Sequence, residues 1–348
     1  MASRLAITCG DPAGIGPEVI SAWLAAHPAE AGDVALIGPA RWLEGLPGPG
    51  ARIPVGLDGF SAEPGRPDGE GSLVAWAAME RAAEGCRTGE FSGVVTGPVS
   101  KERLAGIGWR FPGQTEFFAA RWGGEPTMAF CGGRLRVALL TWHVPFRKVP
   151  DYLTPAHFAR AVAAAAALGA GVRVLEARSD VAGVPDPGAW GPISDPQSPV
   201  SNRPGRGLGP RLQPSHDPLS AVRIGVCGLN PHAGEAGLIG TEERDIIDPI
   251  LDGLRARYPG LSRALPGDTV FARQLRGEFD VVLALYHDQG LAPLKTLEFD
   301  EAVNVTLGLP HVRTSPDHGT AYDIAGRGIA SARSFAAAVE VAKLLSET

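Results

Sequence analysis

The chain has 348 residues, more than one hydrophobic core usually organises, so two lobes are expected. Its net charge of −6, without any Lys/Arg cluster, argues against a nucleic-acid partner, and no apolar run reaches the roughly 18 residues of a membrane span. The N-terminal residues run directly into a strand-like apolar segment, so we expect no signal peptide, and Cys9, Cys86, Cys131 and Cys227 form no CxxC pair. Buried free thiols and a cytoplasmic location are therefore expected.

Short apolar runs alternate with helical stretches along the chain, which predicts an α/β fold. Strands are predicted at 5–9, 34–37, 93–96, 128–131, 135–141, 223–229 and 280–286, and helices at 17–26, 73–84, 155–168 and 334–345. Gly132 and Gly133 predict a hairpin turn between two of these strands. The runs at 223–229 and 280–286 are apolar throughout, which is typical of strands covered on both faces.

A glycine-rich loop, GDPAGIGPE at 10–18, follows the first predicted strand and opens a helix. It resembles a dinucleotide-binding fingerprint, but Val19 stands where the third glycine is needed. Pro17 also removes a backbone donor that a pyrophosphate would use. The loop therefore predicts a tight turn bordering the active cleft rather than a Rossmann site.

One segment, 183–218, contrasts with the rest because it is rich in Pro and Gly and has almost no apolar residues. Such a stretch cannot bury enough surface to offset the entropy of ordering it. It predicts a flexible surface insertion, and a recognition tail is the alternative.

Three histidines, His143, His232 and His287, each come directly after an apolar run. Ligands of open α/β sheets bind outside the carboxyl ends of strands, so three imidazoles delivered there can converge on one point. Neutral imidazole suits zinc and other first-row divalent ions, and three protein ligands leave a position for substrate. The pattern alone is equally compatible with hydrogen-bonded loop histidines, and it fits hydrolytic zinc chemistry as well as any other.

Two further groups of residues suit an anion. Lys295, Asn304 and Arg313 lie close together in a segment otherwise short of charge, and together they suit a phosphate or carboxylate. Gln114 and Thr115 lie at a probable helix start, where backbone N–H groups favour an anion. A plain N-cap by Thr115 is the alternative there.

Several long sequence blocks resemble one family. They are GDPAGIGPE, VTGPVSKERL, FPGQTEFF, CGLNPHAGEAGLIGTEE, YHDQGLAPLKTL and VNVTLGLPHVRTSPDHGTAYDIAG. The family is that of the 4-hydroxythreonine-4-phosphate dehydrogenases of vitamin B6 biosynthesis. The resemblance covers nearly the whole chain apart from 183–218. It implies a two-lobed α/β fold like that of isocitrate and isopropylmalate dehydrogenases, with the active-site cleft between a lobe of 1–115 plus 300–348 and a lobe of 116–299.

The resemblance also implies roles for the histidines. The family's metal ligands match His143, His232 and His287. It implies a homodimer in which each metal site draws ligands from both subunits, with one zinc, magnesium or cobalt ion per site.

The family's substrate-binding positions match the residues of the anion groups, namely Thr115, Lys295, Asn304, Arg313 and the residue before Thr115. That residue is usually His in the family but is Gln114 here, and glutamine can hydrogen-bond without carrying a proton.

Asp268, in the block LPGDT, matches a polar active-site position, and together with Lys295 it is a candidate catalytic residue. No residue is identified for binding the nicotinamide cofactor.

The implied activity is NAD- or NADP-dependent oxidation of 4-phosphohydroxy-L-threonine to a β-keto acid. That acid decarboxylates to 3-amino-2-oxopropyl phosphate, a step toward pyridoxal 5'-phosphate, and the metal polarises the substrate hydroxyl. One alternative is a sister dehydrogenase acting on another 4-phosphorylated hydroxy acid or on an aromatic cis-dihydrodiol carboxylate. A metal-dependent hydrolase and a non-catalytic binding protein are the others.

Overall fold

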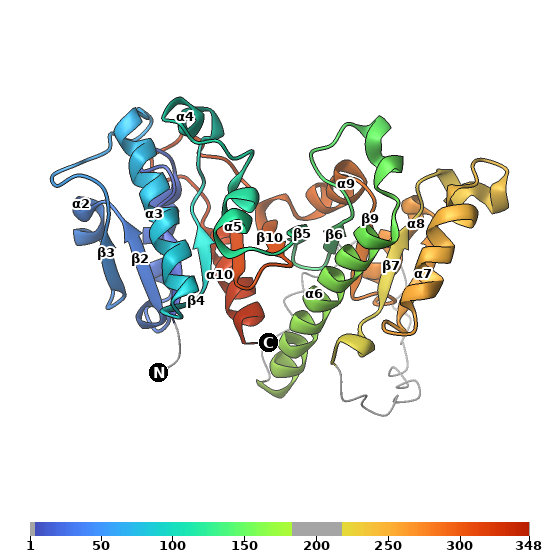
Figure 1. Ribbon diagram of the computed structural model, residues 1–348. Helices are drawn as coiled ribbons and strands as arrows, with labels where there is room; N and C mark the ends of the chain where they lie inside the picture. The colour runs from blue at the N-terminus through green and yellow to red at the C-terminus, as the bar shows by residue number, and fades with distance from the viewer. Residues whose placement is uncertain (1–3, 183–217, 348) are drawn as a thin grey trace, which may run out of the picture.

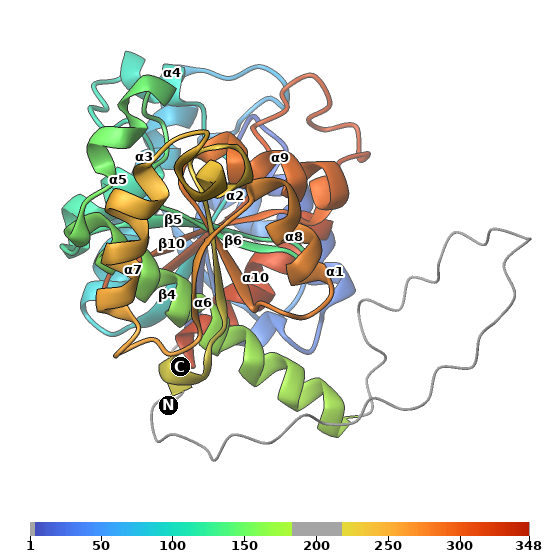
Figure 2. The same ribbon diagram turned by 90° about the vertical axis from the view of Figure 1, so that its right-hand side faces the viewer.

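The computed structural model describes residues 4–182 and 218–347. They form one 11-stranded sheet with helices on both faces, which confirms the predicted α/β class (Figures 1 and 2). The predicted insertion at 183–218 lies outside the described residues except for Pro218. Within the described part of the chain, no helix is long and apolar enough to cross a membrane.

The strand order explains how the two halves of the sheet are joined. The strands are β1 (Arg4–Thr8), β2 (Val34–Gly38), β3 (Ala51–Pro54), β4 (Phe91–Thr96), β5 (Thr127–Cys131), β6 (Arg136–Leu139), β7 (Ile224–Cys227), β8 (Leu261–Leu265), β9 (Val281–Ala284), β10 (Val303–Leu307) and β11 (Val312–Pro316). Their order across the sheet is β3-β2-β1-β4-β11-β10-β5-β6-β9-β7-β8. Neighbours are parallel at both ends of the sheet, whereas β11, β10, β5 and β6 pair antiparallel in the middle. Because one sheet runs through both halves, the division into lobes of 1–115 plus 300–348 and of 116–299 stays a prediction.

The helices largely match the predicted ones. They are α1 (Gly16–Ala26), α2 (Ala40–Glu44), α3 (Gly69–Arg87), α4 (Lys101–Gly106), α5 (Gln114–Trp122), α6 (Pro155–Ala182), α7 (Asp248–Leu254), α8 (Gly267–Leu275), α9 (His287–Glu298) and α10 (Arg333–Ser346). The 3₁₀ and π segments are η1 (Ala31–Asp33), η2 (Phe146–Tyr152), η3 (Pro218–Ala221), η4 (Pro231–Gly237), η5 (Glu243–Ile247) and η6 (Phe299–Glu301). Asp68 caps α3 by accepting a hydrogen bond from Gly71 N at 2.7 Å, so this helix begins before its predicted start.

Helix α6 continues to Ala182, beyond its predicted end at 168, although two glycines follow that point. A Cβ on Gly169 would lie 2.4 Å from a Val222 methyl, and one on Gly171 would lie 2.8 Å from a Leu345 methyl. These glycines therefore let the helix approach its neighbours closely and do not end it.

The two faces of the sheet are packed differently. On one face, α1, α6, α7 and α10 share a continuous buried cluster with strands from both halves. On the other face the buried residues form two clusters, with α3 and α5 over the β1–β4 side and α8 and α9 over the β6–β9 side. Alternate residues of β9 show the division, since Val281 and Leu283 join the first face and Val282 and Ala284 the second. Both faces of this strand are covered, as its continuous apolar run predicts.

The loop GDPAGIGPE forms the tight turn predicted for it. Gly10 has φ +72°, and a Cβ there would lie 2.5 Å from Pro98 O, so only glycine fits. Asp11 N donates to Pro98 O at 2.8 Å, which joins the loop to the segment that leads into Lys101.

All four cysteines are buried and free, as predicted. Burial raises the pKa of the Cys86 and Cys131 thiols to about 12, so both stay protonated at neutral pH.

Candidate active site

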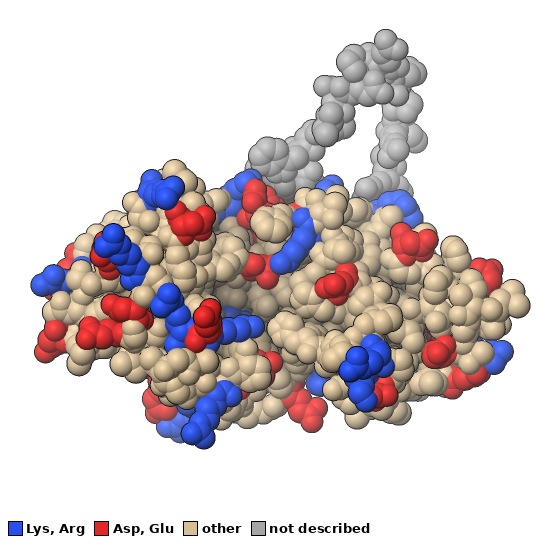
Figure 3. All heavy atoms as spheres, turned by 90° about the horizontal axis from the view of Figure 1, so that it is seen from above, with Lys and Arg blue, Asp and Glu red and all other residues tan. Residues whose placement is uncertain are grey.

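A pocket of about 210 Å³ opens on the face of the sheet where the buried residues form two clusters. Met128 and Phe130 of β5 and Asn304 of β10 form part of its wall, because alternate residues of paired strands point to the same side. The volume equals that of roughly seven water molecules, which suits a small metabolite. Seen from above, the molecule is hollowed near its middle, with charged side chains of both signs around the hollow (Figure 3).

At one end of the pocket lies Arg313, of which only 3% is exposed. Its guanidinium donates to Thr96 Oγ1 at 2.9 Å, to Ser315 Oγ at 2.9 Å and to Asn304 Oδ1 at 3.3 Å. Burial lowers the pKa of Arg313 to about 10, and the charge of Glu116 opposes that shift. A buried cation held by neutral acceptors is costly, so this end of the pocket favours an anion.

The start of α5 forms the wall beside Arg313. Gly113 is the N-cap and makes no side-chain cap, so the alternative of a plain N-cap by Thr115 is wrong. Thr115 lies inside the helix, and its hydroxyl is 3.2 Å from Thr306 Oγ1. Gln114 Nε2 donates to Gly97 O at 3.5 Å, whereas its Oε1 is buried and has no partner among the described residues. The pocket therefore contains a buried acceptor as well as a buried cation.

At the other side of the pocket, His143 and His287 lie with their ring centroids 5.6 Å apart. His143 follows β6, and His287 is the first residue of α9, which follows the neighbouring strand β9. Asp288 Oδ1 lies 2.7 Å from His287 Nδ1, which leaves Nε2 of this ring for a ligand. His143 has φ +41°, a strained left-handed backbone of the kind that collects at functional sites.

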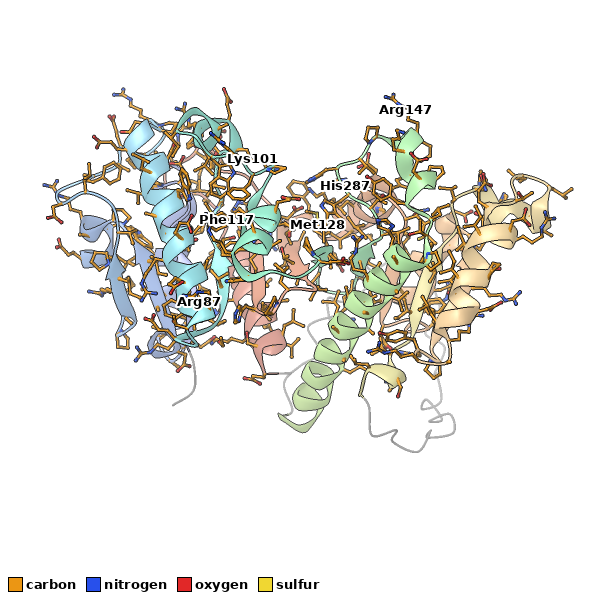
Figure 4. All side chains as sticks on the ribbon, in the orientation of Figure 1. Arg87, Lys101, Phe117, Met128, Arg147 and His287 are labelled. Carbon is orange, nitrogen blue, oxygen red and sulfur yellow. The ribbon has the colours of Figure 1, made fainter. Side chains whose placement is uncertain are left out.

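Lys101 and His287 face each other across the pocket, above Met128 (Figure 4). The pKa of His143 is lowered, chiefly by burial and then by electrostatic interaction with Lys101 and His287, while Glu116 acts in the opposite direction. The lowered pKa keeps His143 neutral near pH 7, which is the form that binds a metal ion.

The other two predicted substrate-binding residues, Asn304 and Lys295, differ in whether they line the pocket. Asn304 lines the pocket together with Arg313. Lys295 does not line it, but Lys295 Nζ lies 2.7 Å from Asp317 Oδ2, and Asp317 is part of the wall. Lys295 therefore contacts the pocket through a carboxylate.

Two predicted site residues lie elsewhere. His232 is exposed on the turn η4 after β7, and Asp268 is exposed in the first turn of α8, which packs beside η4. Neither residue lines the pocket. In the described ranges of this single chain, no three His, Cys, Asp or Glu side chains are grouped so that they could hold a metal ion.

Sequence reasoning missed three charged residues of the pocket, namely Lys101, Glu116 and Asp317. Lys101 and Asp317 follow the carboxyl ends of β4 and β11, so the strand-end argument used for the histidines was a signal that applied to them too.

Comparison with known proteins gives consistent matches over nearly the whole chain. The family model described as "Pyridoxal phosphate biosynthetic protein PdxA" matches residues 34–190 and 215–342. The 4-hydroxythreonine-4-phosphate dehydrogenase of Aromatoleum aromaticum is 41% identical, over 97% of this chain and 95% of that protein. The protein of the same name from Methylorubrum populi is 37% identical, over 99% and 94%. A crystal structure of 4-hydroxythreonine-4-phosphate dehydrogenase from Klebsiella pneumoniae has a TM-score of 0.72 at 30% identity, covering 99% of this chain and 100% of that one.

Proposed function

The chain belongs to the family of pyridoxal phosphate biosynthetic protein PdxA, and we propose that it is a metal- and NAD(P)-dependent dehydrogenase acting on 4-phosphohydroxy-L-threonine. The observation that carries this proposal is a single pocket with two imidazoles at one side and a buried guanidinium at the other. Such a pocket suits a small molecule that presents a phosphate to one end and a hydroxyl to the other.

Arg313, Asn304 and Thr115 are proposed to bind the phosphate. A phosphate there gives the guanidinium the anionic partner that its hydroxyl and amide neighbours do not provide. Gln114 Oε1, which has no partner among the described residues, accepts a hydrogen bond from an ammonium or hydroxyl of the substrate. Binding at this remote end positions the reacting carbon beside the two histidines.

The imidazoles of His143 and His287 fit a divalent ion, because both lie at one pocket and His143 is held neutral. We propose that His232 of a second copy provides the third ligand in a homodimer. His232 and Asp268 lie on neighbouring elements outside the pocket of their own chain, which supports a joint contribution to the other subunit's site. A bound ion supplies Lewis acidity that lowers the pKa of the substrate hydroxyl, and an all-imidazole donor set favours zinc or cobalt over magnesium.

In the proposed reaction, the carbinol carbon gives a hydride to the nicotinamide ring and its hydroxyl gives up a proton, which forms a ketone β to the carboxylate. The bond to the carboxylate then breaks, carbon dioxide leaves, and the carbon takes up a proton to give 3-amino-2-oxopropyl phosphate. The Lys295–Asp317 pair is the group in this chain proposed to hold a proton for these steps, because it combines a pocket-wall carboxylate with an ammonium 2.7 Å away.

The experiment that tests this function is reduction of NAD or NADP with 4-phosphohydroxy-L-threonine as substrate. We expect turnover that stops with a chelator and returns when zinc or cobalt is added back. The unphosphorylated amino acid and an aromatic cis-dihydrodiol carboxylate serve as comparison substrates, each with a much lower kcat/KM. Turnover that needs no nicotinamide, or that survives complete metal removal, contradicts the proposal, and a preference for the dihydrodiol identifies a sister dehydrogenase instead.

A further inference from the structure

The turn η4, called the His232 turn below, has an unusual backbone. Residues 232–236 all have positive φ, with values of 54°, 53°, 79°, 45° and 56°, and only Gly234 among them is a glycine. A left-handed run is unfavourable for L-residues, which usually visit this region singly. Such a run persists only when the surrounding structure determines it strongly.

The side chain that determines it is Glu243, the first residue of η5. Only 4% of Glu243 is exposed. Its Oε1 accepts hydrogen bonds from Leu229 N and Asn230 N, both at 2.7 Å, and its Oε2 accepts one from Asn230 Nδ2 at 3.0 Å. These donors belong to the two residues that precede Pro231, so the carboxylate fixes the chain where the His232 turn begins.

The same carboxylate is enclosed by close approaches of the backbone. A Cβ on Gly234 would lie 2.7 Å from Glu243 Oε2, and one on Gly228 would lie 3.0 Å from Glu243 Oε1. Ala233 N donates to Asn230 O at 3.1 Å, which closes the turn onto the residue that Glu243 holds. The turn is therefore packed around a buried anion that three N–H donors stabilise.

The hydrogen bonds of Glu243 do not involve the His232 imidazole, which is exposed and lies outside the pocket of its own chain. The strained conformation determines where the turn places its exposed residues, and His232 is the first of the left-handed residues.

We infer that Glu243 is a positioning residue, whose buried carboxylate holds the left-handed His232 turn so that His232 is presented outward to the pocket of a second copy. This inference rests on the proposed function, in which His232 completes the metal site of the other subunit. Glu243 contacts neither substrate nor metal and acts only through the backbone of the turn.

The test compares Glu243→Gln with Asp245→Asn in the full-length protein. Glutamine keeps an acceptor for the two backbone N–H groups but turns an N–H donor toward Asn230 Nδ2, so the turn loses the hydrogen bond from Asn230 and the negative charge that its N–H donors face. Asp245→Asn removes the same charge from an exposed position on the same element and is the matched control. We expect the affinity for cobalt, measured by titration calorimetry and by its visible absorption spectrum, to fall at least about tenfold for Glu243→Gln and to stay unchanged for Asp245→Asn.

A double variant separates positioning from general stability. If Glu243 acts through His232, then Glu243→Gln combined with His232→Ala binds cobalt no more weakly than His232→Ala alone. A purely structural role predicts additive losses instead and overturns the inference. Thermal unfolding checks that each variant is folded, and Gly234→Ala, which keeps Glu243 but disturbs the same contact, replaces Glu243→Gln if that variant does not fold.

The outcomes also separate this inference from the proposed function. Unchanged cobalt binding by His232→Ala contradicts the shared metal site and the inference with it. Loss of binding by His232→Ala together with unchanged binding by both Glu243→Gln and Gly234→Ala leaves the metal site intact and overturns the inference alone.

Discussion

Arg313 and His232 lie in opposite surroundings. Arg313 is buried in a central strand, held by several neutral acceptors, and aimed into a pocket that one chain builds from its own sheet. His232 is exposed on a strained turn, and the pocket of its own chain does not include it. Different contacts hold the two, since Arg313 donates hydrogen bonds to neighbouring side chains whereas the backbone just before the His232 turn donates to the buried Glu243. The contrast fits the proposed site, in which a single chain builds the anion end and His232 of a second copy completes the metal end.

The strongest test of this division is a mixture of two inactive variants. His143→Ala and His232→Ala are each expected to lose metal binding and to lose activity by at least about a thousandfold, because each removes a ligand from every site. In a mixed dimer, one site lacks both histidines and the other has all of its ligands. Random exchange of subunits therefore restores about one quarter of wild-type activity, measured by nicotinamide reduction.

The control for that experiment mixes His143→Ala with His287→Ala. Both residues belong to the same side of the site, so each site in a mixed dimer still lacks one ligand and activity stays absent. Equal activity in both mixtures, or none in the first after subunit exchange has been verified, contradicts a site shared between subunits.

At the anion end of the pocket, loss of the Arg313 guanidinium is expected to weaken substrate binding and to stabilise the ligand-free protein. Arg313→Met is expected to weaken substrate binding by about 2–5 kcal/mol, because a buried charged partner is lost. The same change is expected to raise the free energy of unfolding by about 1 kcal/mol, because the folded state no longer holds a cation among neutral groups. The sign follows from the lowered pKa of Arg313, which shows that folding disfavours its charged form.

Calorimetric titration with substrate and denaturant unfolding of the ligand-free protein measure the two effects. Arg263→Met, at an exposed position, is the matched control and should change neither. A loss of stability in Arg313→Met would mean that its hydrogen bonds outweigh the cost of its buried charge.

The sequence predicts the fold well where the signal is local. The apolar runs at 223–229 and 280–286 become β7 and β9, and Gly132 and Gly133 connect the antiparallel strands β5 and β6. The end of α6 was missed because glycine disfavours helix in general, whereas Gly169 is needed there for close packing against Val222. That contact joins segments far apart in the chain, so no local sequence pattern predicts it.

Prediction of the site is also limited by contacts between residues that are far apart in the sequence. His143 and His287 line one pocket, as their positions after strands predict, because β6 and β9 are adjacent and parallel, and their role as metal ligands stays a prediction. His232 has the same kind of position after β7, but it lies on a left-handed turn whose preceding residues donate hydrogen bonds to Glu243, a buried residue with no signal of its own in the sequence. Which way a side chain turns after a strand is decided by such tertiary contacts.

The smallest expected effect concerns the charge that Lys101 places beside the histidines. Lys101→Ala removes a positive charge that lowers the pKa of His143, so this pKa should rise, while burial still keeps it below the ordinary value. Proton NMR titration of the metal-free protein measures the shift, with Lys101→Arg as the charge-retaining control and Lys148→Ala as a control at an exposed lysine that does not line the pocket. A raised pKa makes protons compete with the metal at higher pH, so metal binding by Lys101→Ala should begin to fail at a higher pH than in the wild type. If the pKa of His143 does not change, the charge of Lys101 does not act on His143 and this prediction is wrong.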